Sequence, residues 1–263
     1  MNPAQFLPSA PSIWVQNREY PNGHTVGAHA HRQGQLTYAI SGVMELSVGA
    51  AIWLIPPARG LWIPARMEHG MRARGAVSMR SVYIEADQGW PAGPAAPQAV
   101  PISPLLRELI VRADGLPANY APDSKQARIV SLLIEEIAWS DGAGLRLPTA
   151  KDARLHKICC AILDDPADRR GLDDWAALAG ASPRTLARLF QAELGMSYLY
   201  WRQQAAVMAA LPRLCAGDAV TAIACDLGYD TPGAFSAMFR RIMHTSPSQY
   251  KLSLRAGGPA RTA

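Results

Sequence analysis

The chain has 263 residues, of which 49% are hydrophobic and 18% charged, and its formal net charge is +5. This composition excludes a disordered or fibrous protein and provides the length for about two domains. The sequence pI of about 9.2 suits an anionic partner such as nucleic acid, but it also suits many ordinary soluble proteins. A membrane span needs about 18 consecutive apolar residues, and no apolar run in this sequence approaches that length. The first residues also lack the pattern of a secretion signal. The sequence therefore predicts a cytoplasmic protein without a membrane partner.

The N-terminal part has the pattern of many short strands. Between Thr25 and Glu85, runs rich in apolar and β-branched residues are separated by Gly and Pro, which is typical of a sandwich or barrel. A stretch dense in Pro, Ala and Gly at residues 87–104 predicts the end of this domain. A second segment containing Gly and Pro, at residues 141–150, predicts another linker.

The region between these linkers has helical periodicity. Apolar residues recur at i, i+3, i+4 and i+7 as Val130, Leu133, Ile134 and Ile137, the pattern of an amphipathic helix. This apolar stripe packs either on the first domain or against a second copy of the chain, and the sequence leaves both alternatives open.

The four cysteines are Cys159, Cys160, Cys215 and Cys225. They have neither the spacing of a zinc site nor a matching histidine pattern. We expect them to be reduced and mostly buried small side chains.

The C-terminal region contains an internal repeat. SPRTLARLF, which begins at Ser182, and TPGAFSAMF, which begins at Thr231, both start with a hydroxyl residue and a proline. These residues suit the N-cap and the first position of a helix. A preceding helix ends at Gly180 or Gly228, so each copy predicts a helix-turn-helix. The segment between the copies can form a helix of about 27 Å, which suits two second helices in successive major grooves of DNA.

Residues from about 152 to 252 resemble the DNA-binding domain of AraC/XylS-type transcription regulators. Seven residues match the ending of that domain: Gly228, Tyr229, Thr231, Phe235, Phe239, Pro247 and Tyr250. The resemblance implies an all-α domain whose two helix-turn-helix units bind double-stranded DNA. It also implies a homodimer and, as a further partner, RNA polymerase.

The exposed positions of the two second helices are the predicted DNA contacts. Arg184 and Arg188 lie four residues apart and project from one helix face, where an arginine can bridge guanine O6 and N7 or hold a phosphate. The resemblance implies that both read bases, and the alternative is a pair of solvated surface arginines. The second helix offers mostly small residues, so most hydrogen-bonded reading should come from the first. The predicted DNA-binding residues are Ser182, Arg184, Thr185, Arg188, Gln191, Thr231, Gly233, Ser236, Arg240 and Arg241.

The sequence departs from the family pattern at a few positions. Ala206 and Ala209 stand on the connecting helix where family members commonly have basic residues, so fewer phosphate contacts are expected from it. Pro212 is expected to break a helix that continues through it. His244 stands where a glycine often ends the second recognition helix, and a left-handed conformation there would be less favourable.

Two N-terminal segments resemble the cupin motifs. GHTVGAHAHRQGQLTYAISG begins at Gly23 and has Gln35 where an acidic ligand is usual, and PARMEH has Arg66 in place of a glycine. The resemblance implies a cupin-like β-barrel that binds a small-molecule effector without a required cofactor. The predicted effector-binding residues are His29, His31, Gln35, Tyr38 and His69. A His-x-His pair on a strand directs both rings to one face, so the three histidines also suit a divalent metal, or they form hydrogen bonds within the barrel.

Together these patterns predict a multidomain α+β protein. Its segments are a cupin-like effector-sensing domain at 1–90, a linker and dimerisation segment at 91–150, a DNA-binding domain at 151–252 and a basic tail at 253–263. The predicted function is sequence-specific transcription regulation, as activator or repressor, under control of an effector, and not catalysis. The alternative is a metal-dependent cupin oxygenase or isomerase with a DNA-binding module, which needs an acid or base near the histidines; Glu45 and Glu68 are the candidates.

Overall fold

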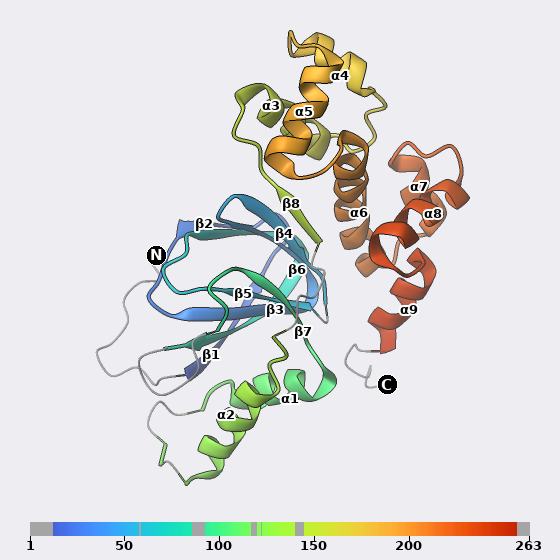
Figure 1. Cartoon of the computed structure of the whole chain (residues 1–263). Helices are drawn as coiled ribbons and strands as arrows, with labels where there is room; N and C mark the ends of the chain where they lie inside the picture. The colour runs from blue at the N-terminus through green and yellow to red at the C-terminus, as the bar shows by residue number, and fades with distance from the viewer. Residues whose placement is uncertain are drawn as a thin grey trace. The chain divides into compact units, whose positions relative to one another are not determined.

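A computed structural model describes residues 13–57, 59–85, 93–116, 120–121, 123–139 and 145–256. Their contacts divide them into two compact units. The first unit contains residues 13–49 and 54–139, and the second contains residues 50–53 and 145–256. In Figure 1 the first unit runs from blue to green, and the second includes the yellow to red helices. Parts of both predicted linkers and residues 257–263 of the predicted tail lie outside the described residues.

The strands join in one eight-stranded sheet. They are β1 (Ile13–Tyr20), β2 (Thr25–His29), β3 (Gly34–Val48), β4 (Ala51–Ile55), β5 (Arg59–Ile63), β6 (His69–Ile84), β7 (Gln98–Pro101) and β8 (Leu145–Pro148). Neighbours follow the order β1-β6-β3-β4-β8, while β2 also pairs with β6, and β5 pairs with both β3 and β7. The predicted cupin-like antiparallel sheet is confirmed, although within the described residues this path does not return to its start, so the sheet is not closed into a barrel.

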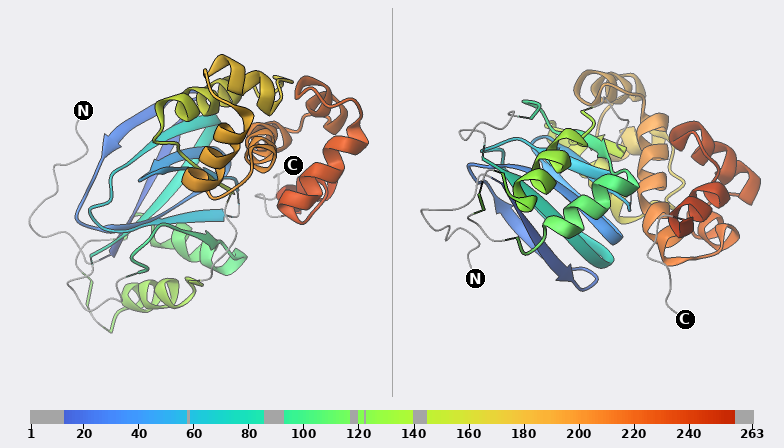
Figure 2. Two further views of the ribbon diagram at one scale, coloured as in Figure 1. Left: turned by 45° about the horizontal axis from the view of Figure 1, so that its top comes forward. Right: turned by 90° about the horizontal axis from the view of Figure 1, so that it is seen from below.

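Two helices cover one face of the sheet in the first unit, as Figure 2 shows from below. They are α1 (Pro104–Ala113) and α2 (Lys125–Glu135). The apolar stripe of Val130, Leu133, Ile134 and Ile137 lies in one core cluster with strand residues such as Leu36 and Val82. The stripe is therefore covered by the sheet of its own chain, which decides between the two alternatives that the sequence left open.

Strands β7 and β8 lie where the sequence predicted linkers. β7 pairs with β5 so that Val100 stands opposite Gly60, and the Val100 side chain is fully buried. In β8, Leu147 is also buried. Each strand has only four residues and a proline at its end, which is too short for the period-two pattern to be read. They are strands because a neighbouring strand supplies hydrogen-bonding partners.

The second unit is mostly helical. Its helices are α3 (Ala153–Asp164), α4 (Leu172–Leu178), α5 (Pro183–Leu194), α6 (Tyr198–Ala216), α7 (Val220–Asp226), α8 (Pro232–Met243) and α9 (Pro247–Ala256). In Figure 1, α6 separates the α4–α5 pair from the α7–α8 pair. The aromatic side chains of Phe190, Trp201, Phe235 and Phe239 are almost fully buried and hold the helices together. The two predicted helix-turn-helix units are therefore present.

Helix α6 continues through Pro212, contrary to the predicted break. Its neighbours Leu211 and Leu214 have 0% and 1% exposure. Burial of such leucines contributes about 1.5 to 3 kcal/mol each, which offsets the roughly 3 kcal/mol cost of a proline within a helix. Tertiary packing thus overrides the local preference of the proline.

The four cysteines are free, but only Cys159 is buried. Cys215 is partly buried, and Cys160 and Cys225 are exposed. The expectation that most of them are buried was wrong, because Cys160 and Cys225 occupy outward positions of short amphipathic helices.

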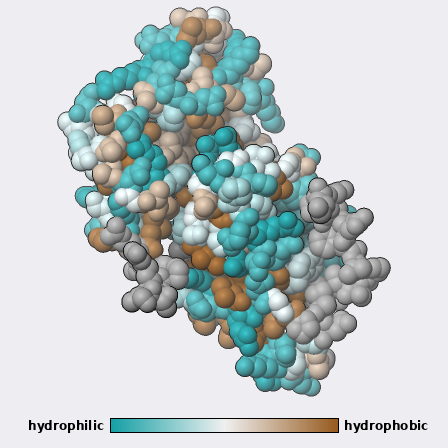
Figure 3. Space-filling model, turned by 180° about the vertical axis from the view of Figure 1, so that it is seen from behind, coloured by the Kyte–Doolittle hydropathy of each residue, from teal (hydrophilic) through white to brown (hydrophobic). Residues whose placement is uncertain are grey.

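The molecular surface in Figure 3 is largely hydrophilic, with hydrophobic residues in groups among polar ones. Of the large apolar side chains on α1 and α2, Leu105, Val111 and Leu132 are between 41% and 49% exposed. None of the described helices is long and apolar enough to cross a membrane.

Candidate effector site and nucleic-acid interface

Three histidines converge at one end of the sheet in the first unit. His29 in β2 stands opposite His69 in β6, and His31 follows two residues after His29. The ring centres of His29 and His31 lie 4.4 Å and 5.0 Å from that of His69. One nitrogen of each ring lies within 4.8 Å of the others. The His-x-His pattern and the later histidine thus meet as the sequence predicted.

Each ring is oriented by a hydrogen bond from its Nδ1 atom to a backbone carbonyl oxygen two residues away. These bonds are His29 Nδ1 to Gly27 O at 2.9 Å, His31 Nδ1 to Gln33 O at 2.8 Å and His69 Nδ1 to Met67 O at 2.9 Å. A carbonyl oxygen only accepts, so the Nδ1 atoms of His29 and His69 carry the proton. In a neutral ring the lone pair is then at Nε2, the atom left to bind a ligand.

His69 is the most buried of the three histidines. His69 is 4% exposed, and its Nε2 atom has no hydrogen-bond partner among the described residues. Burial lowers the pKa of His69 to about 4, and the nearby His29 and His31 act in the same direction. The ring is therefore neutral at pH 7 and presents an unused lone pair.

Gln35 connects this cluster to a buried polar chain. Its Oε1 atom lies 3.0 Å from His31 Nε2, and its Nε2 atom donates to Ser81 Oγ at 2.8 Å. Ser81 Oγ in turn donates to Thr37 Oγ1 at 3.1 Å. The Gln35 Oε1 atom can only accept, so the 3.0 Å contact is a hydrogen bond donated by His31 Nε2.

Tyr38, a predicted effector contact, lies on the other face of the sheet. It is 1% exposed and belongs to the core cluster beneath α1 and α2, where burial raises its pKa to about 12. The tyrosine beside the histidines is Tyr83, whose ring centre is 5.3 Å from that of His31. The period-two alternation of a strand carries the missing signal, because Gln35 and Tyr38 are three residues apart and so point to opposite faces.

The two acidic residues considered as acid or base are not part of the cluster. Glu45 is paired with Arg74, and Glu68 is exposed. Among the described residues the group of potential metal ligands at this site consists of the three histidines. A general acid or base from either glutamate is therefore missing beside them.

Both helix-turn-helix units have the predicted local geometry. Ser182 Oγ accepts from Thr185 N at 3.1 Å, and Thr231 Oγ1 accepts from Ala234 N at 3.1 Å, so both residues are N-caps. The turns contain Gly180 and Gly228 with φ of 61° and 74°. Only glycine adopts this region at no steric cost, which explains why each first helix ends there.

Helix α5 is the recognition helix of the first helix-turn-helix unit, and it presents two arginines to solvent. Leu186 and Phe190 are fully buried, while Arg184 and Arg188 are exposed. Among the described residues neither arginine forms a hydrogen bond or an ion pair. Exposed arginines without partners on one helix face remain available for a ligand.

The remaining predicted contacts are divided between the two recognition helices. On α5, the Thr185 and Ser182 hydroxyls lie 2.8 Å apart, and Gln191 is exposed. On α8, Thr231 and Gly233 are exposed and Ser236 is half-buried. Arg240 is exposed without a partner among the described residues, whereas Arg241 Nη2 donates to Gln203 Oε1 at 2.6 Å.

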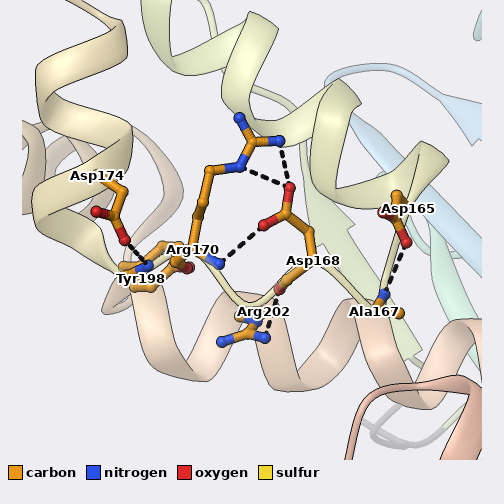
Figure 4. Close-up of polar contacts among 8 residues, drawn as sticks. Asp165, Ala167, Asp168, Arg170, Asp174, Tyr198 and Arg202 are labelled. Carbon is orange, nitrogen blue, oxygen red and sulfur yellow. Dashed lines mark hydrogen bonds and ion pairs between the residues drawn. The ribbon is translucent and has the colours of Figure 1, made fainter.

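The loop between α3 and α4 is fixed against α6, as Figure 4 shows. The carboxylate of Asp168 bonds Arg170, whose guanidinium lowers the pKa of that carboxyl group. Arg202 of α6 donates to the Asp168 carbonyl at 2.5 Å, and Tyr198 OH donates to the Arg170 carbonyl at 2.6 Å. Nothing in the spacing of these residues in the sequence indicates that the loop meets α6, so they were not predicted.

Family models match both units. Residues 11–140 match the AraC-like ligand binding domain, and residues 175–253 match a helix-turn-helix domain. The HTH-type transcriptional regulator NimR of Escherichia coli (strain K12) is 31% identical over 238 residues, which cover 89% of this chain and 85% of that protein. The chain belongs to the AraC family of transcription regulators.

Other comparisons give matches over a smaller share of the chain or at lower identity. The HTH-type transcriptional regulator RipA of Corynebacterium glutamicum is 29% identical over 104 residues, covering 40% of this chain and 31% of RipA. A solved structure of ToxT from Vibrio cholerae is 11% identical and has a TM-score of 0.39, covering 92% of this chain and 98% of ToxT. The regulator thus has a DNA-binding helix-turn-helix domain and a ligand-binding domain.

Proposed function

We propose that this AraC-family regulator reads its operator chiefly through Arg184 and Arg188. The observation that carries the proposal is that both guanidinium groups are exposed on one face of α5 and have no partner among the described residues. A bidentate arginine-guanine contact contributes about 1 to 3 kcal/mol of discrimination. Ser182, Thr185 and Gln191 flank these arginines on the same helix.

The second recognition helix mainly positions the protein on the DNA duplex. Thr231, Gly233 and Ser236 offer small contacts, and Arg240 and Arg241 supply positive charge for phosphates. Phosphate contacts fix the register of a protein on the duplex without reading sequence. In this proposal the second helix-turn-helix unit therefore orients the first helix-turn-helix unit on the DNA.

The effector site in this proposal is the histidine side of the sheet. One ring nitrogen of each of the three histidines lies within 4.8 Å of the others there, and the buried His69 Nε2 atom has no hydrogen-bond partner among the described residues. Such a donor set fits a divalent transition metal, and the backbone carbonyls that contact Nδ1 would hold the rings in orientation. His29, His31 and His69 would hold the ion, with Gln35 beside them, and a metal there would polarise a bound effector. DNA binding itself requires no cofactor.

A catalytic role is not part of the proposal. The relatives that match are transcriptional regulators. Glu45 is engaged by Arg74, so the acid or base that an oxygenase or isomerase needs beside the histidines is not supplied by that residue.

The partners of the proposed regulator are double-stranded DNA, a small-molecule effector, a second copy of the chain and RNA polymerase, and its location is the cytoplasm. The apolar stripe of α2 is used within the chain, so a homodimer would have to use other residues. Leu105, Val111 and Leu132 are exposed apolar side chains of α1 and α2 that suit this use.

The DNA-binding proposal is tested with duplexes tiled across the DNA that flanks the gene of the regulator. We expect wild type to select one duplex, and Arg184→Ala and Arg188→Ala to lose about 1 to 3 kcal/mol on it with relaxed discrimination. Arg128→Ala, which removes an exposed arginine of the first unit, serves as the matched control. Equal losses on all duplexes would instead show that the two arginines hold phosphates.

The effector-site proposal is tested by titrating the full chain with Ni²⁺ and Zn²⁺ in a calorimeter. We expect one ion per chain, and loss of binding in His69→Ala and His31→Ala. His24→Ala is the control because His24 is exposed and lies outside the cluster. Failure of wild type to bind either ion would restrict the site to organic effectors.

A further inference from the structure

A cleft of about 350 Å³ lies beside α6 in the second unit. Its lining combines three segments that are far apart in the sequence. Arg169 comes from the loop between α3 and α4, Arg202 and Gln203 come from α6, and Asp230 and Ala234 belong to the turn and first residues of α8. The cleft therefore lies between the loop that precedes α4, helix α6 and the second helix-turn-helix unit.

Arg169 forms a clasp across this cleft. One of its Nη2 contacts is to the Gly228 carbonyl at 2.8 Å, and another is to Asp230 Oδ1 at 2.9 Å. The two side chains of the ion pair are 65% and 84% exposed. An ion pair so open to water contributes little to stability, so a stronger anion can replace the Asp230 carboxylate.

Two further arginines, Arg202 in the lining and Arg241 beside its lining residue Gln203, form no ion pair among the described residues, although Arg202 helps to lower the pKa of the Asp168 carboxyl group. Arg202 donates to the Asp168 carbonyl, and Arg241 donates to the Gln203 amide. The phenol of Tyr229 lies close to both arginines, and burial raises its pKa, so it stays a hydrogen-bond donor. Of the residues that line the cleft, Asp230 is the one with a carboxylate. The cleft is therefore built to receive an anion.

The cleft is continuous with the exposed start of the second recognition helix. Ala234 lines it and is exposed on α8, and Asp230 directly precedes the N-cap residue Thr231. A duplex that receives the first turn of α8 in its major groove brings its backbone phosphates beside these residues. Two recognition helices in successive major grooves are separated by one stretch of backbone.

We propose that this stretch of DNA backbone lies in the cleft, where Arg169, Arg202 and Arg241 bind phosphate oxygens. The inference rests on the DNA-binding function proposed above and adds contacts that Ala206 and Ala209 of α6 do not provide. The phosphate takes the place of Asp230 on Arg169, so the carboxylate of Asp230 opposes binding. Asp230 thus limits non-specific affinity.

The test measures how salt affects binding of the full chain to a random-sequence duplex of about 30 base pairs, from about 50 to about 200 mM salt. Arg169→Gln and Arg202→Gln should each reduce the salt slope by about 1 and weaken binding severalfold. Asp230→Asn should strengthen binding severalfold. Arg128→Gln, which removes the same charge from the first unit, should retain the wild-type slope.

The clasp variants separate electrostatics from structure. Arg169→Gln and Asp230→Asn both break the clasp, so a merely structural role moves DNA affinity in the same direction in both. The proposal requires opposite directions, and changes in the same direction overturn it. A second result would also overturn the proposal. If wild type and Arg169→Gln bind DNA equally, but inorganic phosphate raises the melting temperature of wild type alone, the cleft is a site for small anions and not for the DNA backbone.

Failure of the cleft proposal is distinguishable from failure of the DNA-binding proposal. If wild type binds and Arg184→Ala weakens binding to the selected duplex, but Arg169→Gln and Arg202→Gln keep the wild-type slope, the backbone does not lie in the cleft. If wild type binds no duplex at all, the DNA-binding proposal itself fails, and the cleft proposal with it.

Discussion

The backbone N–H of Arg66 donates to the carbonyl oxygen of His31 at 2.7 Å, and Arg66 has a left-handed φ of 63°. The hydrogen bond joins the segment before His69 to the segment that carries His31. Arg66 stands where the related cupin motif has a glycine, so the backbone conformation is the one that a glycine adopts without strain.

Replacement of this residue should stabilise the first unit. A left-handed conformation costs a residue with a side chain about 1 to 2 kcal/mol, so we expect Arg66→Gly to raise the free energy of unfolding by about 1 kcal/mol. Gly23→Ala is the reverse control, because Gly23 has a φ of 79° with open space around it. The measurement is chemical denaturation of the full chain, and a lower stability of Arg66→Gly would contradict this account.

Local signals in the sequence predicted most of the second unit. Ser182 and Thr231 as N-caps, Pro183 and Pro232 at the first helical positions, and Gly180 and Gly228 at the turns each act within a few residues. Short-range hydrogen bonds and steric limits decide such features, so spacing alone reveals them. Pro212 was misjudged because the leucines that hold α6 together are covered by other helices.

Features that depend on distant partners were predicted less well. The convergence of His31 and His69 followed from the resemblance, but the hydrogen bonds of Gln35 to Ser81 and the position of Tyr83 depend on strand register. The open edge of the sheet and the short strand β7 likewise depend on which strands become neighbours. The division into segments 1–90, 91–150 and 151–252 stays a prediction.

The stability of the first unit should fall in acid because of His69. Its pKa is about 4 in the folded chain against an ordinary value of 6.5. Between these values the unfolded chain binds a proton that the folded chain does not, so stability is lost as the pH falls from about 6.5 to about 4. The loss is at most about 3 kcal/mol. Thermal melts of wild type and His69→Gln should diverge in this window, and parallel curves would contradict the prediction.

Gln35→Glu should strengthen metal binding and weaken the metal-free protein. Gln35 is 5% exposed and its Oε1 atom faces His31 Nε2. A carboxylate there adds a charged ligand, and we expect affinity for Ni²⁺ to rise at least about tenfold. Without metal the buried charge should lower the melting temperature. Calorimetry with Ni²⁺ measures the first effect, and thermal melts in a chelator measure the second. Gln33→Glu is the control, because the Gln33 side chain contacts Glu85 and not the histidines.

Pro212→Ala should stabilise the second unit. The substitution restores a backbone N–H donor inside α6 and removes a ring that crowds the preceding turn. We expect the free energy of unfolding to rise by about 1 to 2 kcal/mol, partly offset by the greater freedom of the unfolded chain. Ala209→Pro in the same helix should lower it by about 3 kcal/mol or more. Far-UV circular dichroism during denaturation distinguishes the variants, and unchanged stability of Pro212→Ala would show that α6 has adapted to the proline.

The hydrogen bonds from the three histidine Nδ1 atoms to backbone carbonyls determine which chemical groups the cluster can recognise. The buried Nε2 atom of His69 is an electron-pair donor without a partner among the described residues, and one nitrogen of each of the other two rings lies within 4.8 Å, with the Gln35 amide oxygen beside His31. This arrangement repels a bare carboxylate or phosphate and attracts a cation or a group that brings its own hydrogen-bond donor. The cluster therefore selects ligands by electron deficiency rather than by shape.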